Sequence, residues 1–303
     1  IFELKKIPND LIIIGCGVIG IEYASIFAKL GVKVEVIDGR NRPLEFLDYE
    51  IVDQLIFQMR KEGVVFKFGE KVKKVLIDKM NYQRVLVYLE SGEVLNSELA
   101  ILCAGREGST DSLALDKVNV KRDDRKRIIV DKFFRSSTQN IFAAGDVIGY
   151  PSLAATSFEQ GRLAALYMFE QRTKPMSPNF PFGIYSIPEV SMVGLPEHQL
   201  TKKKIPYETG IARYKEISRG NIIGDKYGLL KMNFHSENKK LLGVHIVGTS
   251  ATELIHIGQS AIELEGGLDY FLSTVFNYPT LAECYKVAAL DASNKFLEKE
   301  ERF

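Results

Sequence analysis

The chain has 303 residues, of which 46% are hydrophobic and 26% charged, as in ordinary soluble globular proteins. Its 40 basic and 39 acidic side chains leave a formal net charge of +1, so it has no electrostatic footprint for binding nucleic acid or an anionic membrane. No apolar run approaches the roughly 20 residues that span a bilayer. Three scattered cysteines, Cys16, Cys103 and Cys284, form no metal or C-x-x-C motif, which favours a cytoplasmic location.

A glycine-rich turn opens the first predicted α/β unit. An apolar strand over 11–14 precedes it, a helix over 18–30 follows, and a second strand over 32–37 leads to an acid. All of this lies within about 30 residues, which is the context that makes G-x-G-x-x-G a dinucleotide-binding pattern. The three glycines allow a tight turn, approach of a pyrophosphate and close helix–strand packing. The predicted ligands here are Gly15, Gly17, Val18, Ile19 and Gly20.

The acid after the second strand is followed at once by two arginines. Asp38 stands where a carboxylate accepts from the adenine ribose hydroxyls, which favours NAD. Arg40 and Arg42 are the residue type that NADP sites use for the 2′-phosphate, so the sequence offers features of both sites. Two alternatives stay open: the arginines are ordinary loop residues, or Asp38 pairs with Arg40 instead of facing the ribose.

The next elements complete a Rossmann-like unit that extends to residue 105. Brändén's rule places ligands beyond the carboxyl ends of such strands, so we expect Gly105 and Arg106 near the cofactor. The predicted elements are a helix over 48–61, a strand over 64–66, an antiparallel meander over 72–78, 84–89 and 93–95 with Ser91-Gly92 as its hairpin turn, and a buried strand over 99–105.

The pattern of predicted helices and strands changes in the second half of the chain. An apolar strand is predicted over 140–146, ending in Gly145-Asp146, and a helix over 154–170 follows. Beyond residue 179, strands over 229–233 and 241–247 and helices over 252–264 and 281–297 indicate an α+β domain. The run 276–283 places Tyr278 before Pro279, with Glu283 four residues later.

Together these motifs resemble the FAD-dependent pyridine nucleotide-disulfide oxidoreductases, a family with two dinucleotide-binding domains. The resemblance implies an α/β fold in which a Rossmann-like NAD(P) domain is inserted in a split FAD domain and followed by an α+β dimerisation domain. On that pattern residues 1–9 are a linker, 10–108 the NAD(P)-binding domain, 109–174 the second part of the FAD-binding domain and 175–303 the C-terminal dimerisation domain of a homodimer.

The resemblance also assigns roles to residues. Gly145 and Asp146 match the second FAD signature, and the helix that starts near Leu153 and Ala154 would direct its N-terminal dipole at the flavin. Without the family context, Gly-Asp after a strand is a common turn. Glu22, on the first turn of the nucleotide helix, would position the nicotinamide; the alternative is that it complements the helix dipole.

Tyr278 decides which chemistry the resemblance implies. Members that act on thiols have a histidine directly before this proline, paired with the glutamate as acid and base. A phenol is a poor base at neutral pH, so dithiol chemistry is not expected; Tyr278 alone could equally be an interface aromatic. Tyr278-Pro279, together with Asp111-Ser112-Leu113 after Arg106 and the run 149–154 after Asp146, most resembles the transhydrogenases of the family, which implies hydride transfer between NADPH and NAD+ through FAD.

Two other functions stay open. One is a disulfide reductase like dihydrolipoamide dehydrogenase; the other is a non-catalytic nucleotide-binding and dimerisation fragment. The chain begins at Ile1 without an initiator methionine, and the family's first FAD segment would precede it. We therefore expect that this chain binds nucleotides, its small-molecule substrates, but holds no flavin and is inactive by itself.

Overall fold

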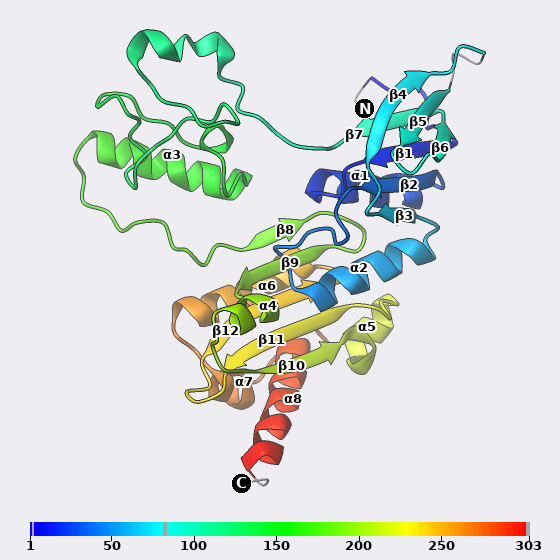
Figure 1. Cartoon of the computed structure of the whole chain (residues 1–303). Coiled ribbons are helices and arrows are strands. Elements are labelled where there is room, and N and C mark those ends of the chain that lie inside the picture. The colour runs from blue at the N-terminus through cyan, green and yellow to red at the C-terminus, as the bar shows by residue number, and fades with distance from the viewer. Residues whose placement is uncertain (2, 81–83, 301–303) are drawn as a thin grey trace. The chain divides into compact units, whose positions relative to one another are not determined.

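The computed structural model describes residue 1, residues 3–80 and residues 84–300. The chain forms two compact units, which are coloured by residue number in Figure 1. Residues 1–104 and 181–303 make the first unit, and residues 105–180 make the second. None of the described helices is long and apolar enough to cross a membrane.

A four-stranded parallel sheet of order β3-β2-β1-β7 carries the glycine turn. Alternate residues of its central strand enter different cores: Leu11 and Ile13 pack under the helices, and Ile12 packs on the opposite face. A strand that is covered on both faces has to be apolar throughout, which explains the run Leu11–Ile14. The elements are β1 (Asp10–Ile14), α1 (Val18–Lys29), β2 (Lys33–Asp38), α2 (Tyr49–Lys61), β3 (Val65–Phe68) and β7 (Leu99–Leu102).

The opposite face of this sheet is covered by an antiparallel meander of order β4-β5-β6. Its strands are β4 (Val72–Ile77), β5 (Val85–Leu89) and β6 (Val94–Ser97), close to the predicted ranges. Gly92 has a φ of +95° in the hairpin between β5 and β6, a conformation that glycine adopts without strain. The predicted Ser91-Gly92 turn is therefore confirmed.

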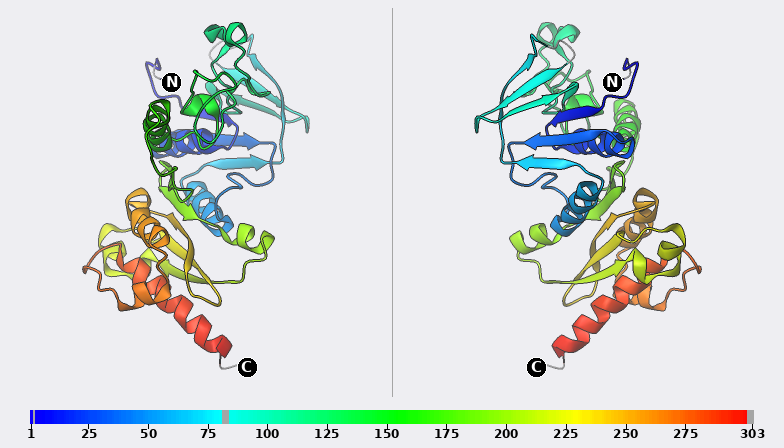
Figure 2. Two further views of the ribbon diagram at one scale, coloured as in Figure 1. Left: turned by 90° about the vertical axis from the view of Figure 1, so that its left-hand side faces the viewer. Right: turned by 90° about the vertical axis from the view of Figure 1, so that its right-hand side faces the viewer.

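A five-stranded antiparallel sheet of order β10-β11-β12-β9-β8 completes the first unit. The long helix α8, drawn in red in Figure 2, packs against β10 and β11, while α6 packs against β12 and β9. The rings of Phe271 on α7 and Tyr285 on α8 are stacked, with 5.5 Å between their centroids, in the hydrophobic core that this sheet and its helices form. The elements are β8 (Phe182–Ile184), β9 (Val190–Gly194), α4 (Glu197–Lys202), β10 (Tyr207–Arg213), η4 (Tyr214–Glu216), α5 (Ser218–Ile223), β11 (Leu229–His235), β12 (Leu241–Val247), α6 (Ala251–Glu263), α7 (Leu268–Ser273) and α8 (Glu283–Glu300).

The second unit has little regular structure. Its elements are three 3₁₀ turns, η1 (Asp111–Leu113), η2 (Leu115–Val118) and η3 (Asp146–Ile148), and the helix α3 (Ala154–Met168). The prediction of a strand over 140–146 is wrong for the described structure. Phe142 makes one isolated bridge with Arg135, and residues 146–148 are a 3₁₀ turn. A strand exists only where a neighbour supplies a ladder of hydrogen bonds, and in the described residues this segment has no such neighbour.

Candidate functional site

The three glycines of the turn have three different environments. Gly15 has a φ of +104°, and a Cβ there would lie 2.9 Å from the carbonyl of Cys103, directly after the neighbouring strand β7. A Cβ on Gly20 would lie 2.0 Å from the Gly15 oxygen, so only glycine lets the helix approach the turn. A Cβ on Gly17 would meet nothing within 4 Å. The backbone at Gly17 is therefore open on the side where a ligand can approach.

Helix α1 begins at Val18 without a side-chain cap, so its first N–H groups have no side-chain acceptor at the N-cap. Such free N–H groups, together with the helix dipole, favour an anion. Cys16, inside the turn, is buried, and burial raises the pKa of its thiol far above the ordinary value. The thiol is therefore an inert packing group.

Asp38 pairs with Arg40 in this structure, which is one of the arrangements that the sequence left open. One carboxylate oxygen accepts from Arg40 N at 2.8 Å and Nε at 2.9 Å. The other accepts from Arg40 Nη2 at 2.7 Å and from Cys16 N at 2.6 Å. Burial alone would raise the pKa of this carboxyl, but the hydrogen bonds from Arg40 and Cys16 outweigh it and hold the pKa below its usual value. Asp38 is 7% exposed, so a ribose reaches it only if Arg40 moves aside.

Arg42 makes a separate set of contacts. Its Nη1 donates to Asp53 at 2.6 Å, and its guanidinium carbon lies 4.5 Å from the centre of the Tyr49 ring. The Tyr49 ring is stacked in turn on His198, with 4.2 Å between centroids and 2° between planes. Sequence reasoning missed both rings, because no local spacing connects residues 49 and 198.

Glu22 lies in the second turn of α1, not in the first as predicted, because the helix already begins at Val18. It therefore does not complement the N-terminal dipole. Its Oε1 accepts from the backbone N of Tyr185, directly after β8, at 2.9 Å. Ser25, one turn later, accepts from Ile187 N at 3.1 Å. The two contacts fix α1 against residues 185–187 of the first unit.

The predicted flavin residues lie in the second unit. Arg106 donates to Asp146 in an exposed ion pair, and Ser157 Oγ lies 3.4 Å from the same carboxylate. Gly145 has a φ of +82°, and its N–H donates to Gln160 Oε1 at 2.8 Å. Leu153 is the N-cap of α3 and Ala154 its first residue; Leu153 supplies no side-chain cap. Gly105 is the first residue of the unit.

Tyr278 is 71% exposed, and its hydroxyl contacts Ser218 Oγ. Glu283 accepts from the backbone N of Thr280 at 3.3 Å, so it holds the start of α8. Neither contact involves a histidine. The arrangement contains no imidazole–carboxylate pair at this proline within the described part of the chain.

A buried ionic cluster lies where α2 meets the five-stranded antiparallel sheet, and the sequence analysis did not find it. Lys231, on β11 and 1% exposed, donates to Asp48 at 2.9 Å, to Glu50 at 3.1 Å and also to Glu197. Burial alone would lower the pKa of this ammonium, but Asp48 and Glu197 hold it above its usual range. In the described residues these carboxylates are the one group with metal-like spacing, and the Lys231 ammonium lies among them as their shared cation. The available signal was a lysine between the apolar residues Leu230 and Met232 of a predicted strand.

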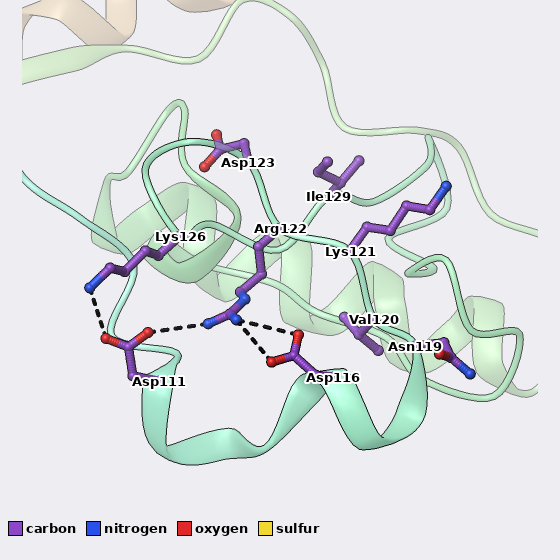
Figure 3. A pocket seen from close by; sticks show the side chains of 9 residues that line it. All are labelled: Asp111, Asp116, Asn119, Val120, Lys121, Arg122, Asp123, Lys126 and Ile129. Atoms are coloured by element: carbon purple, nitrogen blue, oxygen red, sulfur yellow. Dashed lines mark hydrogen bonds and ion pairs between the residues drawn. The ribbon is translucent and has the colours of Figure 1, made fainter.

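The second unit contains a cavity of about 770 Å³ that none of the predicted ligands line (Figure 3). Four of its charged side chains pair with one another: Arg122 donates to Asp111 at 3.2 Å and to Asp116 at 3.4 Å, and Lys126 donates to Asp111 at 2.8 Å. These side chains point toward each other across the cavity wall. A cavity with internally paired charges offers little to an ionic ligand.

Comparison with known proteins gives two family matches. Residues 1–161 match the model for pyridine nucleotide-disulphide oxidoreductases, and residues 180–289 match the dimerisation domain of the same family. The chain is 50% identical over 295 residues to a soluble pyridine nucleotide transhydrogenase of Mycobacterium bovis, covering 97% of this chain and 62% of the relative. A protein of the same name from Erwinia tasmaniensis is 44% identical over 299 residues, covering 97% and 64%. The chain thus spans about three-fifths of these relatives.

Solved structures agree on the fold. The HOCl-induced flavoprotein disulfide reductase RclA from Escherichia coli superposes with a TM-score of 0.89 at 24% identity, covering 95% of this chain and 66% of that one. LpdA from Mycobacterium tuberculosis gives a TM-score of 0.88 at 23% identity, covering 96% and 63%. At these identities the likeness concerns the fold alone.

Proposed function

Because the chain belongs to the pyridine nucleotide-disulphide oxidoreductase family, we propose that the protein of which it is part is a flavoprotein transhydrogenase. It would pass hydride between NADPH and NAD+, as the name shared by its relatives at 44% and 50% identity suggests. We also propose that it works in the cytoplasm as a homodimer, formed through the region that matches the dimerisation domain.

The observation that carries this proposal is the nucleotide turn with its mixed charges. The open backbone at Gly17 leaves room for a pyrophosphate, and the uncapped start of α1 supplies donors for it. Asp38 provides the carboxylate that suits the ribose of NAD, and the neighbouring Arg40 and Arg42 provide cations for the 2′-phosphate of NADP. A transhydrogenase has to accept both nucleotides at one site, and this loop has groups for each.

The residues of the second unit fit half of a flavin site. Asp146 and Gly145 would hold the polar part of FAD, and the uncapped N-terminus of α3 at Leu153 and Ala154 would face negative charge on the ring. When bound, FAD supplies the hydride-carrying chemistry of such enzymes. In the first unit Glu22 would position the nicotinamide. Gly105 and Arg106 are proposed as cofactor contacts of the second unit.

Tyr278 favours the transhydrogenase over the disulfide reductase of the same family. Acid–base service to a dithiol requires a group that gains and loses protons near neutral pH. In the thiol-active members that group is the histidine before the proline that matches Pro279; here the position holds Tyr278, which is exposed and contacts Ser218, and Glu283 accepts from a backbone amide.

The test uses the full-length protein with NADPH as donor and thio-NAD+ as acceptor. If the two nucleotides use one site in turn, the kinetics are ping-pong, and double-reciprocal plots at several acceptor concentrations should give parallel lines. The protein should not reduce lipoamide. Intersecting lines, or lipoamide reduction at a comparable rate, would contradict the proposal. The 303-residue chain alone is expected to bind NADH by calorimetry and to purify without a flavin absorbance band; a yellow chain would contradict that second expectation.

A further inference from the structure

We propose that His198 is a positioning residue for nucleotide selection: through the ring of Tyr49 it holds Arg42 for the 2′-phosphate of NADP(H). The inference rests on the proposed function, and it adds a residue from outside the nucleotide-binding part of the chain. It makes the preference for NADP(H) over NAD(H) depend on how α4 (Glu197–Lys202) meets α2 (Tyr49–Lys61).

Two flat groups, the Arg42 guanidinium and the His198 imidazole, both contact the ring of Tyr49. The Arg42 guanidinium lies 4.5 Å from the Tyr49 ring centre, and the His198 ring covers the same tyrosine at 4.2 Å with nearly parallel planes. Arg42 Nη1 also lies 3.4 Å from the Tyr49 carbonyl and 2.6 Å from Asp53. An arginine held in this way loses less side-chain freedom when it binds a phosphate, so its fixed position favours binding.

The buried ionic cluster holds together the two chain segments that carry Tyr49 and His198. Residue pairs 48–49 and 197–198 meet twice: Asp48 and Glu197 share the buried Lys231, and Tyr49 stacks on His198. Glu197 N also lies 3.4 Å from Asp48 Oδ2. These contacts fix the register of the two helix starts and so bring the Tyr49 and His198 rings side by side.

The charge state of His198 agrees with this role. Partial burial lowers the pKa of its imidazole, Asp48 opposes the shift, and Arg42 and Lys231 add to it. The Nδ1 atom is buried and has no hydrogen-bond partner among the described residues. A neutral ring suits a tyrosine that also carries a guanidinium, since a second cation on the same tyrosine would repel the first.

The test measures two probes by calorimetry on the full-length protein: 2′,5′-ADP, which carries the 2′-phosphate, and 5′-AMP, which does not. His198→Leu and Tyr49→Leu remove the stack and are expected to weaken 2′,5′-ADP about threefold to tenfold while leaving 5′-AMP unchanged. His198→Phe and Tyr49→Phe keep a flat ring and should retain affinity. In an Arg42→Ala background, His198→Leu should cause no further loss.

The outcomes separate the two proposals. If Arg42→Ala leaves 2′,5′-ADP binding unchanged, Arg42 is not a phosphate ligand, and the assignment in the proposed function fails together with this one. If Arg42→Ala weakens 2′,5′-ADP but the leucine variants do not, the positioning role alone is overturned. Equal loss of both probes in the leucine variants would mean a general structural role and would also overturn it; the 5′-AMP affinity thus reports on an intact pocket.

Discussion

The two compact units differ in how they hold their charged groups. In the first, residues 1–104 and 181–303 surround two extensive hydrophobic cores, and Lys231 and Asp48 are both 1% exposed. In the second, the one hydrophobic cluster of buried residues is small, with Leu115, Val120 and Ile128, and the ion pairs of Arg122 lie nearer the surface. Lys231 in the first unit and Arg122 in the second each lie between carboxylates, so the two units contain the same kind of ionic contact at different degrees of burial. We therefore expect burial, and not the number of ion pairs, to decide which cluster contributes more to the free energy of unfolding.

The largest effect should come from breaking the buried cluster. Lys231→Met leaves Asp48 as an uncompensated buried charge, which typically costs about 3–5 kcal/mol of unfolding free energy. Arg122→Met, in the cluster of Figure 3, is the matched control and should lose a small fraction of this, because water solvates the acids it leaves behind. Urea denaturation measures both. Similar losses in the two variants would remove the contrast between the units.

A second prediction concerns acid stability of the first unit. Burial lowers the pKa of His245, which lies near Asp48, Lys231 and Glu197, to about 4, against 6.5 for an unperturbed histidine. Between these values the unfolded chain binds a proton that the folded chain does not, so stability should fall as pH drops from 6.5 to 4, by about 3 kcal/mol in total.

The check is a series of denaturation curves across that pH range. His245→Gln should flatten the dependence, while His256→Gln, at an exposed position on α6, should leave it unchanged. An unchanged slope in His245→Gln would show that other groups control acid stability.

A third and smaller effect separates folding from binding within the glycine turn. A Cβ at position 20 collides with the backbone of Gly15, so Gly20→Ala should cost about 1–3 kcal/mol. Gly17→Ala meets no protein atom and should leave the melting temperature within error while weakening NADH, because the added methyl occupies the side open to a ligand. Equal melting temperatures for the two variants, measured by circular dichroism, would mean that the turn relaxes freely.

How much the sequence could predict depends on how local each signal is. The glycine turn, the helix that follows it and the acid at the end of β2 are encoded within 38 residues, and the structure has them where the pattern placed them. The strand over 140–146 was wrong because its apolar run carries no information about a pairing neighbour. The pairing of Asp38 with Arg40 was undecided because their spacing permits both arrangements. Lys231 and Asp48 are 183 positions apart, so only the folded chain reveals their contact.

The most direct test of a site for both nucleotides is the double variant Arg40→Ala, Arg42→Ala, titrated with NADPH and with NADH by calorimetry. The contacts of Asp38 give the two nucleotides opposite expectations. NADPH should weaken by about tenfold or more, because its 2′-phosphate loses charge-assisted partners. NADH should bind as well as before or better, because removing Arg40 frees Asp38 for the ribose. Equal weakening of both nucleotides would contradict the account and return the arginines to an ordinary role in the loop.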